Sequence, residues 1–74
     1  MTDVLVDQQG RRCPLPVIEL ARAARTAPSG SRLVLLATDP ATRHDVPAWC
    51  RMRGHTLLES TEDGGVLRFV VVVA

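Results

Sequence analysis

The chain passes from loop to helix in one short stretch, Gly10-Arg11-Arg12-Cys13-Pro14-Leu15-Pro16, in which a cysteine comes directly before the first proline. Apolar residues then recur at i, i+3, i+4 and i+7, the spacing of one helix stripe, at Val17, Leu20, Ala21 and Ala24. Proline is tolerated in a first helical turn because its missing N–H would have no partner there. The sequence therefore predicts a helix over residues 14–26 with Cys13 at its N-cap.

An N-cap position would activate the Cys13 thiol. The first-turn N–H groups and the helix dipole place partial positive charge beside the sulfur, which favours the thiolate, and Arg11 and Arg12 act in the same direction. We therefore expect an exposed sulfur with a pKa below the ordinary cysteine value of about 8.5. The alternative is that Cys13 is a small apolar filler, because free cysteine is among the most buried residue types.

Two strands are expected around this helix. Residues 4–6 form a short apolar run before it, and Pro28 and Gly30 disrupt helical continuation after it. Residues 32–38 are almost continuously apolar between turn residues, the pattern of an interior strand. Strand, helix and strand in this order predict a right-handed parallel crossover.

A second helix is expected to reach about Arg53, with Asp45 as the N-cap of its main part, Pro47 in its first turn and Gly54 as its C-cap. One face of this helix would carry Val46, Trp49, Cys50 and Arg53. Residues 56–60 and 66–73 then form two strands, joined through the hairpin signal Glu62-Asp63-Gly64-Gly65.

The resulting order β-α-β-α-β-β predicts an α/β fold, a two-layer sandwich with two helices on one face of a four-stranded mixed sheet. Because two helices cover only one side of a sheet, one face of the last strand should stay exposed and serve as an interface. The two faces of that strand carry Leu67, Phe69, Val71 and Val73 on one side and Val66, Val70 and Val72 on the other.

Composition limits the class of protein. At 74 residues the chain is expected to be a single domain spanning 1–74, and its 46% hydrophobic content, with one Phe, one Trp and no Tyr, predicts an aliphatic core. Nine arginines against eight acidic residues give a net charge of +1, too balanced for a dedicated nucleic-acid binder. Eight of the arginines fall within residues 11–53, where they form either a solvated face or a docking surface for an acidic partner.

The first residues lack the basic and long apolar segments of a secretion signal, and no stretch approaches the roughly 18 to 20 apolar residues of a membrane span. We therefore expect a cytoplasmic protein. That setting argues against a disulfide between Cys13 and Cys50, and favours a chemical role for at least one of them.

Several short motifs follow one another in a fixed order: Asp7-Gln8-Gln9-Gly10-Arg11-Arg12-Cys13-Pro14-Leu15-Pro16, Gly30, Asp39-Pro40-Ala41, Asp45-Val46-Pro47, Cys50 and Gly54-His55. In this order they resemble the TusA-type (SirA-like) sulfur-carrier family over about residues 3–73. The specific part is Cys-Pro-x-Pro after a short strand. Two departures are Arg11, where the family usually has leucine, and the end Val72-Val73-Ala74, where many members have a basic residue.

The resemblance implies a sulfur carrier that takes sulfane sulfur as a persulfide on Cys13 and passes it to a partner protein. It implies a cysteine desulfurase or rhodanese-like donor, a downstream acceptor in tRNA thiolation, molybdenum-cofactor synthesis or sulfur oxidation, and no cofactor. Gly10, Pro14 and Pro16 would shape the motif. Arg11 and Arg12 would dock the partner.

Other candidates are weaker. Cys50 is interpreted as a half-buried helix residue beside Trp49, with a resolving or regulatory role as the alternative. His55 is interpreted as a loop imidazole bonded to backbone, or else as a group near the cysteine. A zinc site of Cys13, Cys50, His44 and His55 lacks the close ligand pairs of such sites.

Asp7 and Asp39, at the ends of the first two predicted strands, are interpreted as turn formers. The rival function is a non-catalytic regulatory or binding module. Such a module would use an arginine-rich helical face to contact its partner, and Cys13 would then be structural.

Overall fold

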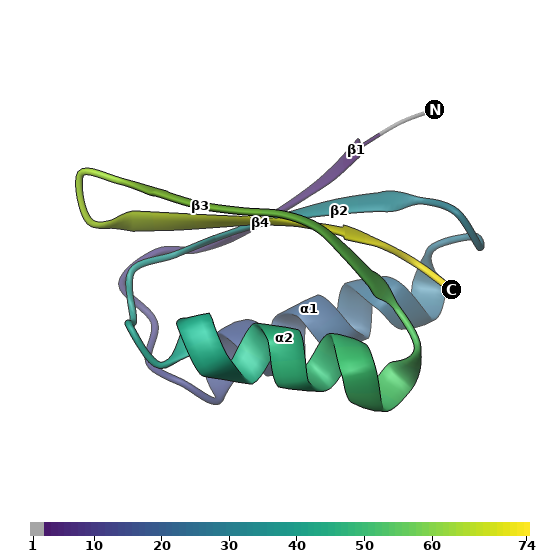
Figure 1. Cartoon of the computed structure of the whole chain (residues 1–74), viewed down its shortest axis with the longest axis horizontal. Helices are drawn as coiled ribbons and strands as arrows, with labels where there is room; N and C mark the ends of the chain where they lie inside the picture. Colours follow the sequence, from purple (N-terminus) through teal and green to yellow (C-terminus); the bar gives the residue numbers. More distant parts are fainter. Residues whose placement is uncertain (1–2) are drawn as a thin grey trace.

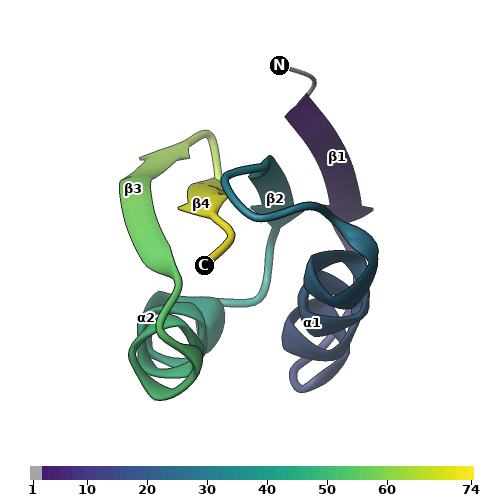
Figure 2. The ribbon, with the colours of Figure 1, turned by 90° about the vertical axis from the view of Figure 1, so that its right-hand side faces the viewer.

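The elements follow one another in the predicted order in a computed structural model that describes residues 3–74. They are β1 (Asp3–Gln8), α1 (Leu15–Thr26), β2 (Arg32–Ala37), α2 (Thr42–Arg53), β3 (Thr56–Asp63) and β4 (Val66–Val72). Both helices lie on one face of a four-stranded sheet, α1 under the β1 side and α2 under the β3 side (Figures 1 and 2). The predicted two-layer sandwich is therefore confirmed.

The sheet is mixed, with the strand order β1-β2-β4-β3. β1 pairs with β2 in parallel, whereas β4 pairs antiparallel with both β2 and β3. The apolar strand β2 is therefore interior, as its sequence predicts. Because β1 and β2 run in the same direction and each is followed by a helix, α1 and α2 both begin at the same edge of the sheet (Figure 1).

The hairpin between β3 and β4 is a two-residue turn. Asp63 pairs with Val66, and the residues between them, Gly64 and Gly65, have φ angles of 59° and 82°. Two successive left-handed residues are the signature of a type I′ turn, which glycine adopts without steric cost. β3 reaches Asp63, three residues beyond the predicted end at residue 60, because the ladder continues to this turn after a bulge near Leu57.

The core lies between the sheet and the two helices. Leu20 from α1 and Val46 from α2 are fully buried and belong to the same apolar cluster as Leu33, Leu35 and Phe69 from the sheet. Aliphatic side chains make up most of this cluster, as the composition predicts. The row Leu67, Phe69, Val71 and Val73 of β4 and its extension is buried throughout.

The opposite row of β4 differs from the prediction. Val70 has 0% exposure, and Val66 and Val72 are half-buried. The reason is the position of β4 between two strands, because Val70 lies opposite Val34 on β2 and Glu59 on β3, whose side chains flank it. On the edge strand β1, by contrast, Leu5, which pairs with Val34, is 62% exposed.

The start of α2 also differs from the prediction. The N-cap is Ala41, so Asp45 lies in the first turn and Pro47 lies inside the helix. No side chain caps the first turn of this helix; Asp39 instead fixes the turn before it, where its side-chain Oδ1 accepts the Ala41 N–H at 2.9 Å. The C-cap is Gly54 with a φ of 77°, as expected.

At twelve residues each, the two helices found within residues 3–74 are too short to cross a bilayer.

Candidate functional site

Cys13 lies in the turn that joins β1 to α1. The N-cap of α1 is Pro14, not Cys13 as the sequence predicts, and the Cys13–Pro14 peptide bond is cis. Helical bonding begins with the Pro14 carbonyl, which accepts the Ile18 N–H at 2.9 Å, while the turn before it is closed by the Leu15 N–H and the Arg12 carbonyl, also at 2.9 Å. Cys13 is therefore one residue outside the helix start.

The end of β2 holds the cysteine loop from the side. Asp39 Oδ2 accepts the backbone N–H of Cys13 at 2.8 Å, and the Thr38 hydroxyl accepts the N–H of Gly10 at 2.8 Å. The other carboxylate oxygen of Asp39 binds the N–H of Ala41, at the entrance to α2. One carboxylate therefore fixes both the Cys13 turn and the start of the second helix.

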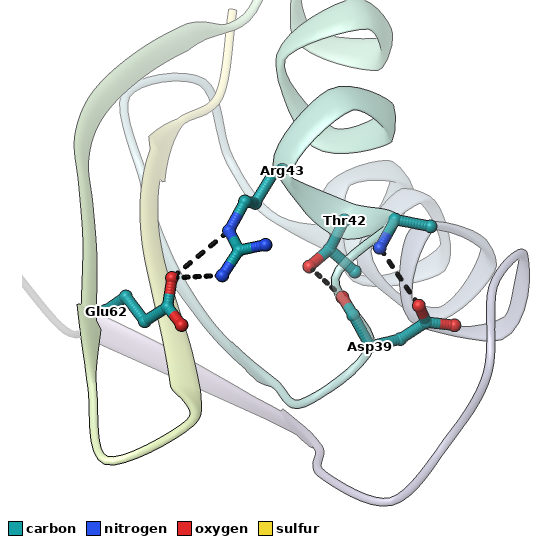
Figure 3. Close-up of polar contacts among 5 residues, drawn as sticks. Asp39, Thr42, Arg43 and Glu62 are labelled. Atoms are coloured by element: carbon teal, nitrogen blue, oxygen red, sulfur yellow. Dashed lines mark hydrogen bonds and ion pairs between the residues drawn. The ribbon is translucent and has the colours of Figure 1, made fainter.

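Further polar contacts fix the first turn of α2 (Figure 3). The Thr42 hydroxyl, which is fully buried, donates to the Asp39 carbonyl at 2.7 Å. Arg43 donates through Nε to Glu62 of β3 at 3.1 Å. These contacts tie the segment that follows β2, which includes Asp39, to both the sheet and α2.

The Asp39 carboxyl is held in its charged form. Its pKa is lowered from the ordinary value by the hydrogen bond from the Ala41 N–H and then by the bond from the Cys13 N–H, with a smaller contribution from the Arg12 guanidinium. A carboxylate that accepts two backbone N–H groups binds its proton less well than a solvated one. Asp39 is therefore an anion beside Cys13 at neutral pH.

The environment of the Cys13 sulfur opposes ionisation. The pKa of this thiol is raised to about 11, first by partial burial and then by the negative charges of Asp45 and Asp39. The expectation of a lowered pKa is therefore wrong. The helix dipole and the exposed Arg11 and Arg12 are outweighed by the partial burial of the thiol and by the acidic side chains, of which Asp39 binds the Cys13 N–H.

The two secondary candidates lie away from Cys13. Cys50 is 2% exposed in the core, where burial raises its pKa. His55 Nδ1 accepts the Ala74 N–H at 3.0 Å and its ring lies 4.7 Å from that of Trp49, so its interpretation as a backbone-bonded loop imidazole is confirmed. His55 follows the C-terminal end of the twelve-residue α2, about 18 Å along the helix from the end that faces Cys13.

No group of three or more His, Cys, Asp or Glu side chains is placed to hold a metal ion within residues 3–74. The four zinc candidates are consequently not gathered into one site.

A shallow hollow of about 440 Å³ lies beside the cysteine loop, lined by the Gly10–Arg12 segment and by residues 38–40. Arg11 and Arg12, predicted to dock a partner, are exposed at this edge. Sequence reasoning missed the roles of Asp39 and Asp45. A signal for Asp39 existed, because the loops after two parallel neighbouring strands meet at one edge of the sheet. No local signal connected Asp45 to Cys13.

Comparisons with known proteins agree with this arrangement. A family model described as Sulfurtransferase TusA matches residues 4–73. The sulfur carrier protein TusA of Pseudomonas putida (strain F1) is 40% identical over 67 residues, which are 90% of this chain and 84% of the relative. The putative sulfur carrier protein YrkI of Bacillus subtilis (strain 168) is 37% identical over 68 residues, 92% of this chain and 91% of the relative.

A solved structure of a SirA-like protein has the same fold. The crystal structure of a SirA-like protein from Desulfitobacterium hafniense superposes with a TM-score of 0.83 at 25% identity, covering 96% of this chain and 97% of that one. The matched family, the named relatives and the shared fold agree along almost the whole length. The chain therefore belongs to the TusA family of sulfur carrier proteins.

Proposed function

We propose that this protein carries sulfane sulfur as a persulfide on Cys13 and relays it to a partner protein. The observation that supports this most is the contrast between the two cysteines: Cys13 is half-buried in a turn at the sheet edge, whereas Cys50 lies in the core. Only the first can reach a sulfur atom held by another protein. Its backbone is also fixed by Asp39, which gives the sulfur a defined position.

The transfer proceeds by exchange at sulfur. The Cys13 sulfur attacks the outer sulfur of a donor persulfide, the bond between the two donor sulfurs breaks, and the donor cysteine leaves with the electron pair. The same exchange in a second round passes the outer sulfur to an acceptor cysteine. The chain itself needs no cofactor for either step.

A carrier of this kind works between a donor and an acceptor protein. We propose a cysteine desulfurase or a rhodanese-like protein as the donor, and an acceptor in tRNA thiolation, molybdenum-cofactor synthesis or sulfur oxidation. Arg11 and Arg12 supply exposed positive charge beside the loop that presents Cys13, which suits an acidic docking surface.

The test is loading by a cysteine desulfurase and free cysteine, followed by intact-mass and peptide analysis. The wild-type chain should gain one sulfur atom, confined to Cys13, and the gain should disappear on reduction. Cys13→Ser should gain none while remaining folded, because its backbone N–H still binds Asp39 and a hydroxyl cannot form a persulfide.

Cys50→Ala is the matched control. It should load normally and lose stability by about 1 kcal/mol, in line with a small change in a packed core. A folded wild-type chain whose Cys13 stays unmodified and unreactive would favour the rival function, a binding module that uses its arginines. Loss of loading in Cys50→Ala would replace the single-cysteine relay with a two-cysteine mechanism.

A further inference from the structure

A second hollow, of about 380 Å³, lies where the two helices end. Arg25 in the last turn of α1 and Arg53 in the last turn of α2 line it, together with Trp49 and His55. The ends of both helices lie on one side of the molecule, and the end of β4 lies beside them (Figure 1). This helix-end hollow is at the opposite end of the helices from Cys13.

The charged side chains that line the helix-end hollow are basic. Arg25 and Arg53 are both exposed. The ion pairs found within residues 3–74 are made by other arginines: Arg22, Arg32, Arg43 and Arg68. No Asp or Glu side chain of this part of the chain lines the hollow. Two guanidinium groups therefore border one concave surface with no acidic side chain beside them.

His55 adds a hydrogen-bond donor to the same hollow. Its Nδ1 accepts the Ala74 N–H at 3.0 Å, and a neutral imidazole that accepts through one nitrogen carries its proton on the other. The donor of the neutral ring is therefore Nε2–H. The ring is half-buried and its centroid lies 4.7 Å from that of Trp49, so this contact and the Ala74 bond fix its orientation.

An arginine in the last turn of a helix has an ordinary explanation, because a cation there interacts favourably with the helix dipole. Arg51 fits that explanation: it is exposed in the same turn of α2 as Arg53, but it does not line the hollow. The dipole accounts for one basic residue at each helix end. It does not account for two of them sharing a concave surface with a histidine donor and an aromatic ring.

We propose that the helix-end hollow binds a small organic anion, whose phosphate or carboxylate group is held by Arg25 and Arg53. Guanidinium groups present paired N–H donors that match these oxyanions, and His55 supplies a further donor. Much of the remaining lining consists of small apolar side chains of α1: Ala21, Ala24 and Ala27. The volume is near the lower end of the range for small-molecule sites, which suits a ligand built on a single ring.

The proposed site is separate from the sulfur chemistry. Each helix is twelve residues long, so the hollow lies about 18 Å along the helices from the edge that presents Cys13. A ligand bound there leaves the cysteine loop free. Because α1 and α2 each supply one arginine, the bound anion also connects the ends of the two helices.

The experiment titrates the full chain with phenyl phosphate, which joins an anionic group to a single ring, and follows the backbone amide and imidazole signals by NMR. Inorganic phosphate supplies the anion alone, and phenol supplies the ring without the charge. The variants are Arg25→Gln and Arg53→Gln, with Arg51→Gln as the matched control. Every protein carries the same short tail after Ala74, so that no terminal carboxylate lies in the hollow.

Phenyl phosphate should shift the amide signals of residues that line the hollow and the Nε2 signal of His55. Arg25→Gln and Arg53→Gln should each weaken its binding about fivefold, the upper range for ion pairs open to solvent, whereas Arg51→Gln should weaken it less than about twofold. Inorganic phosphate should bind more weakly than phenyl phosphate, and phenol should bind most weakly, because the ligand needs both parts.

Three results would overturn the proposal. Equal weakening by all three variants would show that phenyl phosphate responds only to the net charge of the chain. Signal shifts that gather around Arg11 and Arg12 would place anion binding at the Cys13 edge. Inorganic phosphate that binds as tightly as phenyl phosphate would remove the organic ligand. The titration involves no sulfur transfer, so its outcome does not depend on the proposed function.

Discussion

The Asp39 carboxylate has two structural roles: it accepts the Cys13 N–H in the turn before α1 and the Ala41 N–H at the entrance to α2. The hydrogen bonds that lower its pKa stabilise the folded state only while the group is ionised. Because the folded-state pKa is lowered, this stabilisation is present above the unfolded value of 3.8 and is lost as the pH falls through the folded-state value.

Asp39→Asn should therefore melt below the wild-type temperature at neutral pH, because an amide offers one acceptor oxygen where the carboxylate offers two. The two melting temperatures should converge in acid, once wild-type Asp39 is protonated. Thermal unfolding followed by circular dichroism between neutral and acidic pH measures both. A difference that persists unchanged in strong acid would show that the two N–H bonds do not depend on the charge.

The residue scale is also where sequence reasoning about the site reached its limit. The Cys-Pro-x-Pro segment identified the reactive candidate, and the burial of Cys50 beside Trp49 agrees with its helical spacing. The ionisation of Cys13 was predicted with the wrong sign. The charges that raise its pKa belong to Asp39 and Asp45, 26 and 32 positions further along the chain, whereas the local sequence shows only Arg11 and Arg12.

At the scale of the elements, the β3–β4 hairpin gives a direct test of backbone conformation. Gly65 has a φ of 82°, where a β-branched residue is strained, so Gly65→Val should destabilise the fold by about 1 to 2 kcal/mol. Gly64→Asn is the matched control, because asparagine is favoured at the first position of a type I′ turn. Denaturant midpoints of the two variants should differ clearly; equal midpoints would mean that the turn changes type to accept the side chain.

Element types were predictable, because the apolar periodicity of residues 14–26 indicates a helix with one buried face and the nearly continuous apolar run of residues 32–38 indicates an interior strand. The first residue of each helix was not predictable in the same way. At both helices the predicted N-cap was the residue with the best local signal, Cys13 or Asp45, while Asp39 organises both segments. Neither helix has a side-chain cap, and a carboxylate that binds the turns before both helices from the end of β2 leaves no trace in the residue spacing of either helix.

The sheet shows the same limit. Alternation along β4 predicts two rows correctly, but exposure depends on how many strands flank the row, and β4 has a neighbour on each side. Val70 is therefore buried on a face that no helix covers. A substitution at the buried Val70 is therefore expected to lower the stability of the fold. Leu5 on β1 is exposed, so a substitution there tests whether this face of the sheet binds a partner.

Across the whole molecule, positive and negative charges nearly cancel, but they are unevenly distributed over the surface. The net charge is +1, yet the edge that presents Cys13 combines exposed arginines at positions 11 and 12 with carboxylates at 39 and 45. Both carboxylates raise the pKa of the Cys13 thiol. The arginines project outward, where they act during the approach of a partner.

Replacing Arg11 and Arg12 together with glutamine should therefore slow loading by a protein donor and make that rate less sensitive to salt. Exposed charges steer association and are screened beyond a Debye length of about 10 Å at about 0.1 M salt. The measurement is the rate of sulfur uptake from a desulfurase over a series of salt concentrations. Arg51 and Arg53, exposed on the last turn of α2, provide a control pair of equal charge.

The outcome separates two surfaces of the same protein. If the first pair steers the donor, its replacement flattens the salt dependence and replacement of the second pair leaves it nearly intact, since Arg51 and Arg53 lie at the far end of α2 from Cys13. If the second pair has the larger effect, the donor approaches along the helices. Small-molecule alkylation should be almost unchanged in both variants, because the burial and carboxylates that set the Cys13 pKa remain in place.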